Sequence, residues 1–437
     1  MVNWVEHKDR DGLIAEVHAR PRQLVPAPCA MARIDFFVSH EEAKAHITRL
    51  QARLAGRGGE MPADDARHHV YTEGGLRVVL ERHTEFVSYT LIDTEPPKTP
   101  FGEDLLAKAP DDAFEEVPGA RVSAIRLHLA DSKTGTLDEK LCDKLFGHTD
   151  YAASSLRGGD ASMACDFRPD EDGFMRFVVF DSTKAAAVRG RMVQRIFELE
   201  AYRMAAMLAL PVARDAGAVL AKLESQLDEV SLRIAAGPHA AKDRDILQRL
   251  TRLAGDAETL RAKGEYRFAA ARAYGAIVED RNDRLRASRI EGHERVGVFI
   301  ERRLQPALRT CEAIAARQNA VAERVDRAVQ LLATRVQVDV EEQNKNILSS
   351  MNSRAEAQLR LQQAVENLSA VAITYYAVSL IYYIFQGLST AGMGVEPTYA
   401  AAISTPIIFV TALFGVRLVR NWLDKRMKEP ALPDEDD

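Results

Sequence analysis

Residues 368–388 read LSAVAITYYAVSLIYYIFQGL, and residues 398–416 read TYAAAISTPIIFVTALFGV. Neither stretch contains Asp, Glu, Lys or Arg, and Glu396 is the one charged residue between Asn367 and Val416. A helix rises about 1.5 Å per residue, so about 20 residues cross a hydrocarbon core that is about 30 Å thick. The two stretches therefore predict a pair of transmembrane helices. Two buried helices of a soluble domain are the alternative.

Positive residues flank this pair on one side. Arg354 and Arg360 precede it, and five Lys or Arg residues lie between Arg417 and Lys428, whereas the connecting loop has none. Because Lys and Arg concentrate on the cytoplasmic side of a membrane, we expect both termini in the cytoplasm and the loop 389–397 outside. The charged run at residues 6–11, EHKDRD, is not followed by the apolar segment of a signal peptide.

Residues 1–182 predict a mixed α/β domain in the cytosol. Alternating or β-branched runs indicate strands, at Met31–Val38, Leu76–Arg82, Phe86–Ile92, Val122–Leu129 and Phe174–Phe180. Two helices are expected at Glu41–Leu54 and Thr136–Leu145. The four cysteines have no paired spacing, which is typical of reduced thiols in a cytosolic body.

Residues 183–366 predict a helical bundle and a long stalk helix, because Gly and Pro become sparse there. The expected helices are Lys184–Leu210, ended at Pro211, then Arg214–Ala235 and Lys242–Ala262. From Glu265 the helical pattern continues to the membrane, with Gly292, Gly297 and Pro306 as its weak points. Residues 367–420 then form the transmembrane pair, and residues 421–437 form a tail that is first basic and then acidic.

Apolar residues recur every eleven positions along the stalk. Val325, Val336 and Ile347 form one such series, and Val340 and Met351 continue a second. Eleven residues give 3.67 per turn, which favours nearly straight or slightly right-handed packing of long helices. We therefore expect a coiled-coil-like stalk whose partner is another helix of the chain or another copy of it. An ordinary amphipathic helix on a globular core is the alternative.

Polar residues form a stripe within the first transmembrane stretch. Tyr375, Ser379, Tyr382, Gln386 and Ser389 follow at steps of four, three, four and three, so they share one helix face. Such a face is out of place against lipid. It predicts either a channel lining, if identical copies surround an axis, or packing against the second transmembrane helix, where small residues allow close approach.

The loop FQGLSTAGMGVEP at 385–397 has two interpretations of the same kind. Gly392 and Gly394 allow the backbone to turn, and exposed carbonyl groups can replace the water around a cation. Glu396 would concentrate cations, or bind one, at the outer mouth of a pore. The alternative is a flexible hairpin with one solvated acid.

Elsewhere, two groups of residues carry metal-binding side chains. His18 and Arg20 form one, and Glu81, His83 and Glu85 would share one face if they lay on one strand. A solvated strand face is the alternative. We find no nucleotide, hydrolase or paired-cysteine motif, and hence we expect no enzymatic activity and no cofactor. The net charge of −6, without a basic patch, predicts no nucleic-acid partner.

Four stretches of the chain resemble a bacterial family of membrane-anchored proteins that is defined only as a domain of unknown function. They are EVHARP at 16–21, ERHTEF at 81–86, FELEAYRMAAMLALP at 197–211 and RLQQAVENLSAVAITYYAVSLIYY at 360–383. The resemblance extends over nearly the full chain. It implies a multi-pass protein of the bacterial inner membrane but no particular activity.

The order of segments is similar to that of the CorA class of divalent-cation channels. These are pentamers whose first transmembrane helix lines the pore and ends in Gly-Met-Asn. Gly392 and Met393 match that motif, and Gly394 departs from it. The missing asparagine amide places magnesium selectivity in doubt.

Together these features predict an α/β cytosolic domain, a long helical stalk and two C-terminal transmembrane helices. The leading hypothesis is a homo-oligomer, with a pentamer favoured, that conducts a divalent cation and is gated by its cytosolic domain. The second hypothesis is a membrane-anchored scaffold or sensor without conduction, with a cytosolic partner that the sequence does not identify. An enzyme with an unrecognised site is a distant third.

Overall fold

The computed structural model describes residues 5–18, 23–64, 66–96, 99–102, 104–110, 113–114, 117–133, 135–147, 150–237, 240–392, 394 and 396–427. The chain divides into two compact units, Met1–Gln330 and Leu331–Asp437. The boundary between the units lies within one helix, α7, which extends over 95 residues from Val296 to Thr390.

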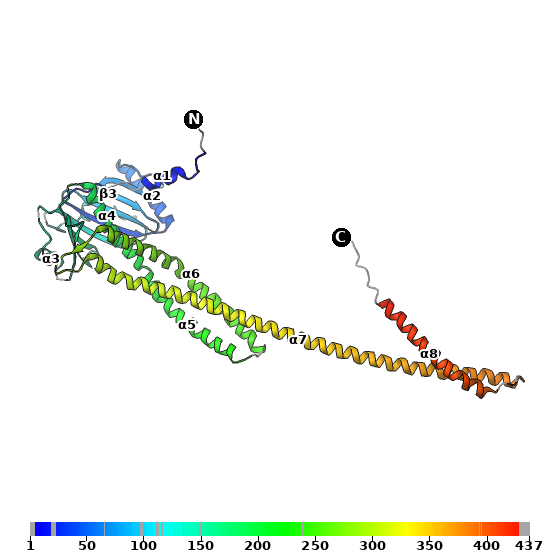
Figure 1. The fold of residues 1–437 in the computed structure, drawn as a ribbon. Helices are drawn as coiled ribbons and strands as arrows, with labels where there is room; N and C mark the ends of the chain where they lie inside the picture. The colour runs from blue at the N-terminus through cyan, green and yellow to red at the C-terminus, as the bar shows by residue number, and fades with distance from the viewer. Residues whose placement is uncertain are drawn as a thin grey trace. The chain divides into compact units, whose positions relative to one another are not determined.

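Within the described residues, the first unit contains a sheet of nine strands in the order β2-β3-β4-β1-β5-β8-β7-β6-β9 (Figure 1). The strands are β1 Cys29–Phe37, β2 His68–Glu73, β3 Leu76–Arg82, β4 Phe86–Asp93, β5 Ala120–Asp131, β6 Ala152–Leu156, β7 Ala161–Pro169, β8 Met175–Asp181 and β9 Ser288–Arg289. Neighbouring strands in this order are antiparallel, except β5 and β8, which are parallel. The α/β prediction for this region is confirmed.

The helices are α1 Arg10–His18, α2 His40–Arg57, α3 Glu139–Phe146, α4 Ala186–Met207, α5 Ala209–Ala235, α6 Ala240–Leu285, α7 Val296–Thr390 and α8 Pro397–Met427, with a 3-10 turn η1 at Leu106–Lys108. Successive strand residues point to opposite faces of a sheet. Ile34 of β1 packs in one core with Leu50 of α2, whereas Arg33 beside it lies against Phe197 of α4. Helices α2 and α4 therefore cover opposite faces.

Helix α3 lies on the same face as α2. Ala124 of β5 belongs to the core beneath α2, and Ala130, six residues later and hence on the same face, packs with Phe146 of α3. Two separate apolar cores therefore share this face, with the middle of β5 between them.

Several helix boundaries differ from those predicted. The first helix ends at Met207 rather than at Pro211, because Pro211 lies in the first turn of α5, where its missing N–H group is not needed. Helix α6 continues past Ala262 to Leu285. The chain then breaks near Gly292, whose φ of 84° suits glycine, whereas Pro306 is accommodated inside α7.

The connection from α6 to α7 adds strand β9 to the edge of the sheet. Ser288 and Arg289 pair with β6, and the backbone N–H of Ala153 donates to the Glu294 carbonyl at 3.0 Å. The backbone N–H of Val296, the first residue of α7, donates to the hydroxyl of Ser154 at 3.0 Å. Helix α7 thus begins on the sheet edge.

Among the described residues, three helical segments are long and apolar enough to cross a membrane: Ala186–Ala235, the end of α7, and Pro397–Val419. The last two contain the predicted stretches. The first belongs to the unit that contains the sheet, and its apolar side chains Ile196, Phe197 and Ala205 are buried there.

An ionic network lies buried between the sheet and α4. Arg33 donates to Asp35 at 3.0 Å, to Glu81 at 2.7 Å and to the Ser88 hydroxyl at 2.8 Å. All four side chains are buried, and Phe197 covers the guanidinium. One cation therefore balances two carboxylates out of contact with water. The second oxygen of Asp35, Oδ2, has no hydrogen-bond partner among the described residues.

The pKa values of this network depend on the pairing. Burial alone would raise the pKa of Glu81, but the charge of Arg33, with smaller contributions from His83 and His68, brings it below the ordinary value of 4.5. Burial would likewise lower the pKa of Arg33, yet Asp35 and Glu81 raise it. Both groups are therefore charged at neutral pH.

Replacing the cation tests how strongly the network stabilises the fold. We expect Arg33→Met to reduce the free energy of unfolding by about 3–5 kcal/mol, because two buried carboxylates lose their counter-charge. Urea titration of the full-length protein in mild detergent, followed by circular dichroism, measures this loss. Arg302→Met is the matched control, since its pair with Glu294 is mostly exposed and its loss should change little.

The destabilisation should also depend on pH. In the native protein, stability from Glu81 is present above pH 4.5 and is lost as the pH falls through its lowered pKa. In Arg33→Met the burial of Glu81 is uncompensated, so its protonation on acidification relieves the penalty. The difference between the two proteins should shrink as the pH falls from 7 towards about 4. A difference independent of pH would contradict this assignment.

Candidate functional site

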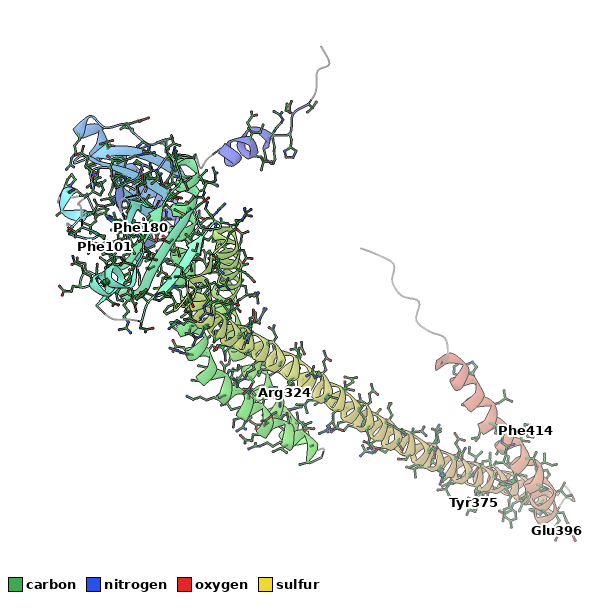
Figure 2. The ribbon with its side chains drawn as sticks, turned by 60° about the vertical axis from the view of Figure 1, so that its left-hand side comes forward. Phe101, Phe180, Arg324, Tyr375, Glu396 and Phe414 are labelled. Atoms are coloured by element: carbon green, nitrogen blue, oxygen red, sulfur yellow. The ribbon has the colours of Figure 1, made fainter. Side chains whose placement is uncertain are left out.

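The predicted polar stripe lies on the last part of α7. Tyr375, Tyr382 and Gln386 are exposed, and Tyr375 has 69% of its surface accessible (Figure 2). The hydroxyl of Ser379 donates to the carbonyl oxygen of Tyr375 at 2.7 Å, so this group is satisfied within the helix. The three longer polar side chains have no such local partner recorded among the described residues.

Helix α8 folds back beside the end of α7 (Figures 1 and 2). On α7 the buried positions are Ala370 and Thr374, and on α8 Ala400, Ala401 and Ser404 are half-buried. Small residues allow two helices to approach closely. Ile381 and Phe385 of α7 are also half-buried, so small and large apolar side chains share this contact, and the exposed stripe residues lie beside it.

The described residues of the loop between the two helices cap the helix ends. The N–H of Gly392, which has a φ of 87°, donates to the Ser389 carbonyl at 3.2 Å and closes α7. The Glu396 carbonyl oxygen accepts hydrogen bonds from the backbone N–H groups of Tyr399 and Ala400, at the start of α8. The carboxylate of Glu396 is exposed, as is Gly394, whereas Met393 lies outside the described residues.

The Glu81, His83 and Glu85 arrangement does not form the expected strand face. Strand β3 ends at Arg82, and residues 83–85 form the turn into β4. Glu81 pairs with Arg33, whereas Glu85 accepts from Arg267 at 2.7 Å. In the part of the chain that the structure describes, no group of three or more His, Cys, Asp or Glu side chains could hold a metal ion. Arg20 and the side chain of His18 lie outside that part.

Two of the stretches that carry the family resemblance contact each other. The Tyr202 hydroxyl lies 3.2 Å from Nδ1 of His83, and the Tyr202 ring packs edge-on against Phe86 at 5.6 Å. Glu85 also accepts a hydrogen bond of 2.5 Å from Tyr274 of α6. Residues 81–86 and 197–211 therefore build the contact between the sheet and its covering helices.

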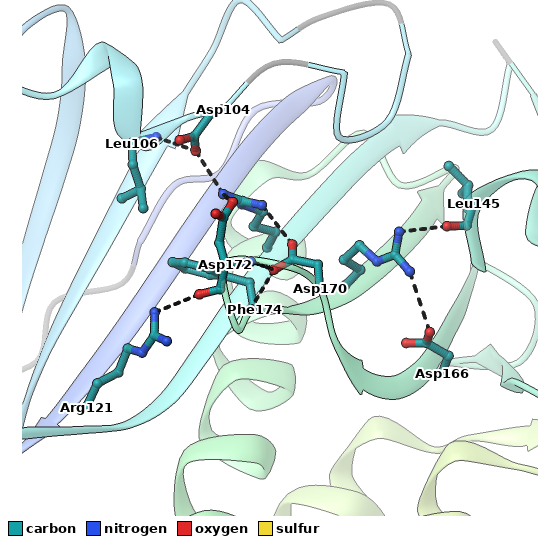
Figure 3. A network of polar contacts seen from close by, with 10 residues as sticks. Asp104, Leu106, Arg121, Leu145, Asp166, Asp170, Asp172 and Phe174 are labelled. Carbon is teal, nitrogen blue, oxygen red and sulfur yellow. Dashed lines mark hydrogen bonds and ion pairs between the residues drawn. The ribbon is translucent and has the colours of Figure 1, made fainter. Parts of the chain in front are cut away.

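A second ionic cluster lies on the opposite face of the sheet, between the α2 and α3 cores. Arg126 of β5 binds Asp170 at 2.7 Å, Asp172 at 2.8 Å and Asp104 at 2.9 Å (Figure 3). Its guanidinium lies 4.6 Å from the ring centre of Phe174. This cluster joins the segment after β4 to the turn before β8, which is a structural role.

Neither ionic cluster was predicted from the sequence. The available signal was a charged residue within an otherwise apolar strand, as at Arg33 in CAMARIDFF and Arg126 in ARVSAIRLHLAD. A charge at such a position requires a partner, but the partner comes from other strands and cannot be identified from local spacing.

Comparison with known proteins identifies a family but no activity. No curated protein matches the chain. The family model described as "Protein of unknown function (DUF3422)" matches residues 5–423, which include the sheet, the covering helices and both apolar helices of the second unit. The chain therefore belongs to the DUF3422 family.

Proposed function

We propose that this protein is a homo-oligomer of the inner membrane, with α7 and α8 as a transmembrane hairpin and both termini in the cytoplasm. In this proposal the hairpin conducts a cation, in an arrangement similar to that of the CorA class, and the α/β unit regulates it. The proposal involves no enzymatic step and no bound cofactor, because the cation is cargo or signal.

The observation that carries the proposal is the uncovered polar stripe. Tyr375, Tyr382 and Gln386 lie outside the contact with α8. Polar side chains within a membrane need protein or water beside them, since lipid offers no hydrogen-bond partner. If identical copies surround an axis, each contributes the same side chains to the wall of a central path.

The stalk segment of α7 supplies an independent reason for self-association. Val325 is buried in the first unit, whereas Ile347, which continues its eleven-residue series, is 57% exposed, and Met351 of the second series is 61% exposed. An apolar face of this length on a soluble helix marks an interaction surface. A second copy presents the same face and fits the same repeat.

A scaffold or sensor without conduction is the second candidate. The observation in its favour is the loop, because Gly394 stands where the CorA class has asparagine and the Glu396 carbonyl is used to cap α8. In that case the stripe would be covered by a neighbouring copy and no water-filled path would exist.

Topology is tested with a reporter that is active only in the periplasm. We expect no activity when it is fused before Met1 or after Asp437, and activity when it is inserted near Thr390, because positive residues flank the hairpin on one side. Activity of the C-terminal fusion would contradict the hairpin.

Assembly is tested by the mass of the purified particle in detergent. We expect a closed ring, with five copies favoured, and we expect Ile347→Glu to dissociate it because a charge enters the repeated apolar face. Ser349→Glu is the matched control, since it adds the same charge at an exposed polar position on the other side of the helix, two residues away. A monomeric native protein would contradict any pore, and a dimer would favour the scaffold.

Conduction is tested by divalent-cation uptake into liposomes that contain the purified protein. We expect Gln386→Leu and Tyr382→Leu to reduce uptake at least several-fold, because an apolar constriction resists water entry. Tyr383→Leu is the matched control, as it changes the adjacent tyrosine, which lies off the stripe. Glu396→Lys should slow uptake more strongly at low salt, where screening is weak.

Two results would separate the candidates. Uptake equal to that of empty vesicles for magnesium, cobalt, nickel, zinc and manganese would leave the anchored scaffold or sensor. Uptake that persists unchanged in all the stripe variants would place the path elsewhere in the protein.

A further inference from the structure

A cavity of about 680 Å³ lies on the α2/α3 face of the sheet, beside the core beneath α3. Its walls come from five parts of the chain, namely Pro28 before β1, Pro96 and Pro100 after β4, His128 of β5, residues 135–141 at the start of α3, and Phe180 of β8. Figure 2 shows Phe180 in this part of the α/β unit, with Phe101 nearby. The volume lies in the range of small-molecule sites.

Small residues keep this cavity open. Ala130 of β5 and Gly135 after it line the space, where larger side chains would fill it. A Cβ atom on Gly135 would lie 3.2 Å from Cε1 of Phe180, so the backbone passes close to that ring. The adjacent core around Phe146 is closed by α3. The cavity is therefore a distinct space at the border of that core.

His128 is the buried polar group of the cavity wall. Only 6% of its surface is exposed, and its Nδ1, which water cannot reach, has no hydrogen-bond partner among the described residues. Burial lowers the pKa of His128, so the imidazole is neutral at pH 7. The second ring nitrogen, Nε2, is not one of these buried atoms, so it is the group that can pair with a ligand in the cavity.

Phe101 holds the imidazole from one side. The two ring centres lie 6.3 Å apart at an angle of 66°. Phe101 adopts a φ of 60°, which is uncommon for a bulky residue. It lies in a turn of the chain directly after Pro100. Unusual backbone conformations of this kind are concentrated at functional sites.

The charge of the wall restricts what the cavity accepts. No Lys or Arg occurs among the described residues that line it. Asp138 lines the rim, and its side chain already accepts the N–H of Leu141 at 2.7 Å, which caps α3. Without a cation, and with the N-terminal turn of α3 occupied, the site offers no counter-charge to a phosphate or carboxylate.

We propose that this cavity binds an uncharged, largely apolar ring compound that carries one hydrogen-bonding group, which pairs with the imidazole of His128. The proline rings and Phe180 form the apolar wall, and His128 determines the orientation of the ligand. This inference goes beyond the proposed membrane function and does not depend on it, because every residue involved lies in the first unit.

The probes that test it are 2-naphthol, naphthalene and 2-naphthoate, which share one ring system. The first is neutral and carries a hydroxyl, the second lacks that group, and the third is an anion. Full-length protein in detergent is incubated with each probe, and hydrogen exchange is followed by mass spectrometry. We expect 2-naphthol to slow exchange several-fold in peptides that cover residues 99–110 and 135–146, and 2-naphthoate to bind at least tenfold more weakly.

Two variants distinguish this site from partition of the probe into detergent. Thr136 is an exposed lining residue, so Thr136→Trp should fold and should raise the dissociation constant of 2-naphthol at least tenfold by occupying the cavity. Thr48→Trp, at an exposed position of α2, is the matched control and should leave it unchanged. His128→Phe should weaken 2-naphthol about tenfold but not naphthalene, because only the former loses a hydrogen bond.

Three outcomes would overturn the proposal. The first is the absence of local protection by any probe. The second is protection that Thr136→Trp does not reduce, which would indicate binding to detergent or to another surface. The third is tighter binding of 2-naphthoate than of 2-naphthol, which would mean that the site attracts anions.

Discussion

Apolar surface that the chain does not cover itself is the constraint on which the rest of this structure depends. Along α7, the large apolar side chains from Val296 to Val325 are buried or half-buried, but those from Val338 to Val365 are exposed, and so are most of those that follow in the apolar stretch. Exposure of either apolar part to water is unfavourable. Lipid can cover the second part, and a protein surface suits the first, which is interspersed with charges. The proposed membrane insertion and self-association both rest on these two exposed parts of one helix.

In the first unit, by contrast, buried and half-buried charges are paired with residues of the same chain. Arg33 and Arg126 lie on the two faces of the central strands, and each collects carboxylates from segments that are distant in the sequence. Removal of Arg33 would leave two buried acids unpaired, whereas two of the three partners of Arg126, Asp104 and Asp172, are exposed. The networks make the relative placement of strands and covering helices specific.

The elements that were predicted from the sequence are those whose side-chain types and spacing are typical of one secondary structure. Strands such as β4, FVSYTLID, are β-branched and aromatic and were predicted, whereas β6, AASSL, has small side chains without alternation and was missed. The polar stripe on α7 follows from helical geometry alone. The cavity beside His128 could not be predicted, because its walls come from five segments and their proximity depends on the whole sheet.

The attachment of α7 to the sheet has a mechanical consequence. The helix starts at a hydrogen bond between the Val296 N–H and Ser154, directly after the two residues of β9 that pair with β6. Farther along the same helix, Arg317 pairs with Glu224 of α5, and the side-chain amide of Gln318 donates to the Leu260 carbonyl of α6. A twist of α7 from its far end would therefore load these helix contacts first and reach the hydrogen bonds of the sheet edge last.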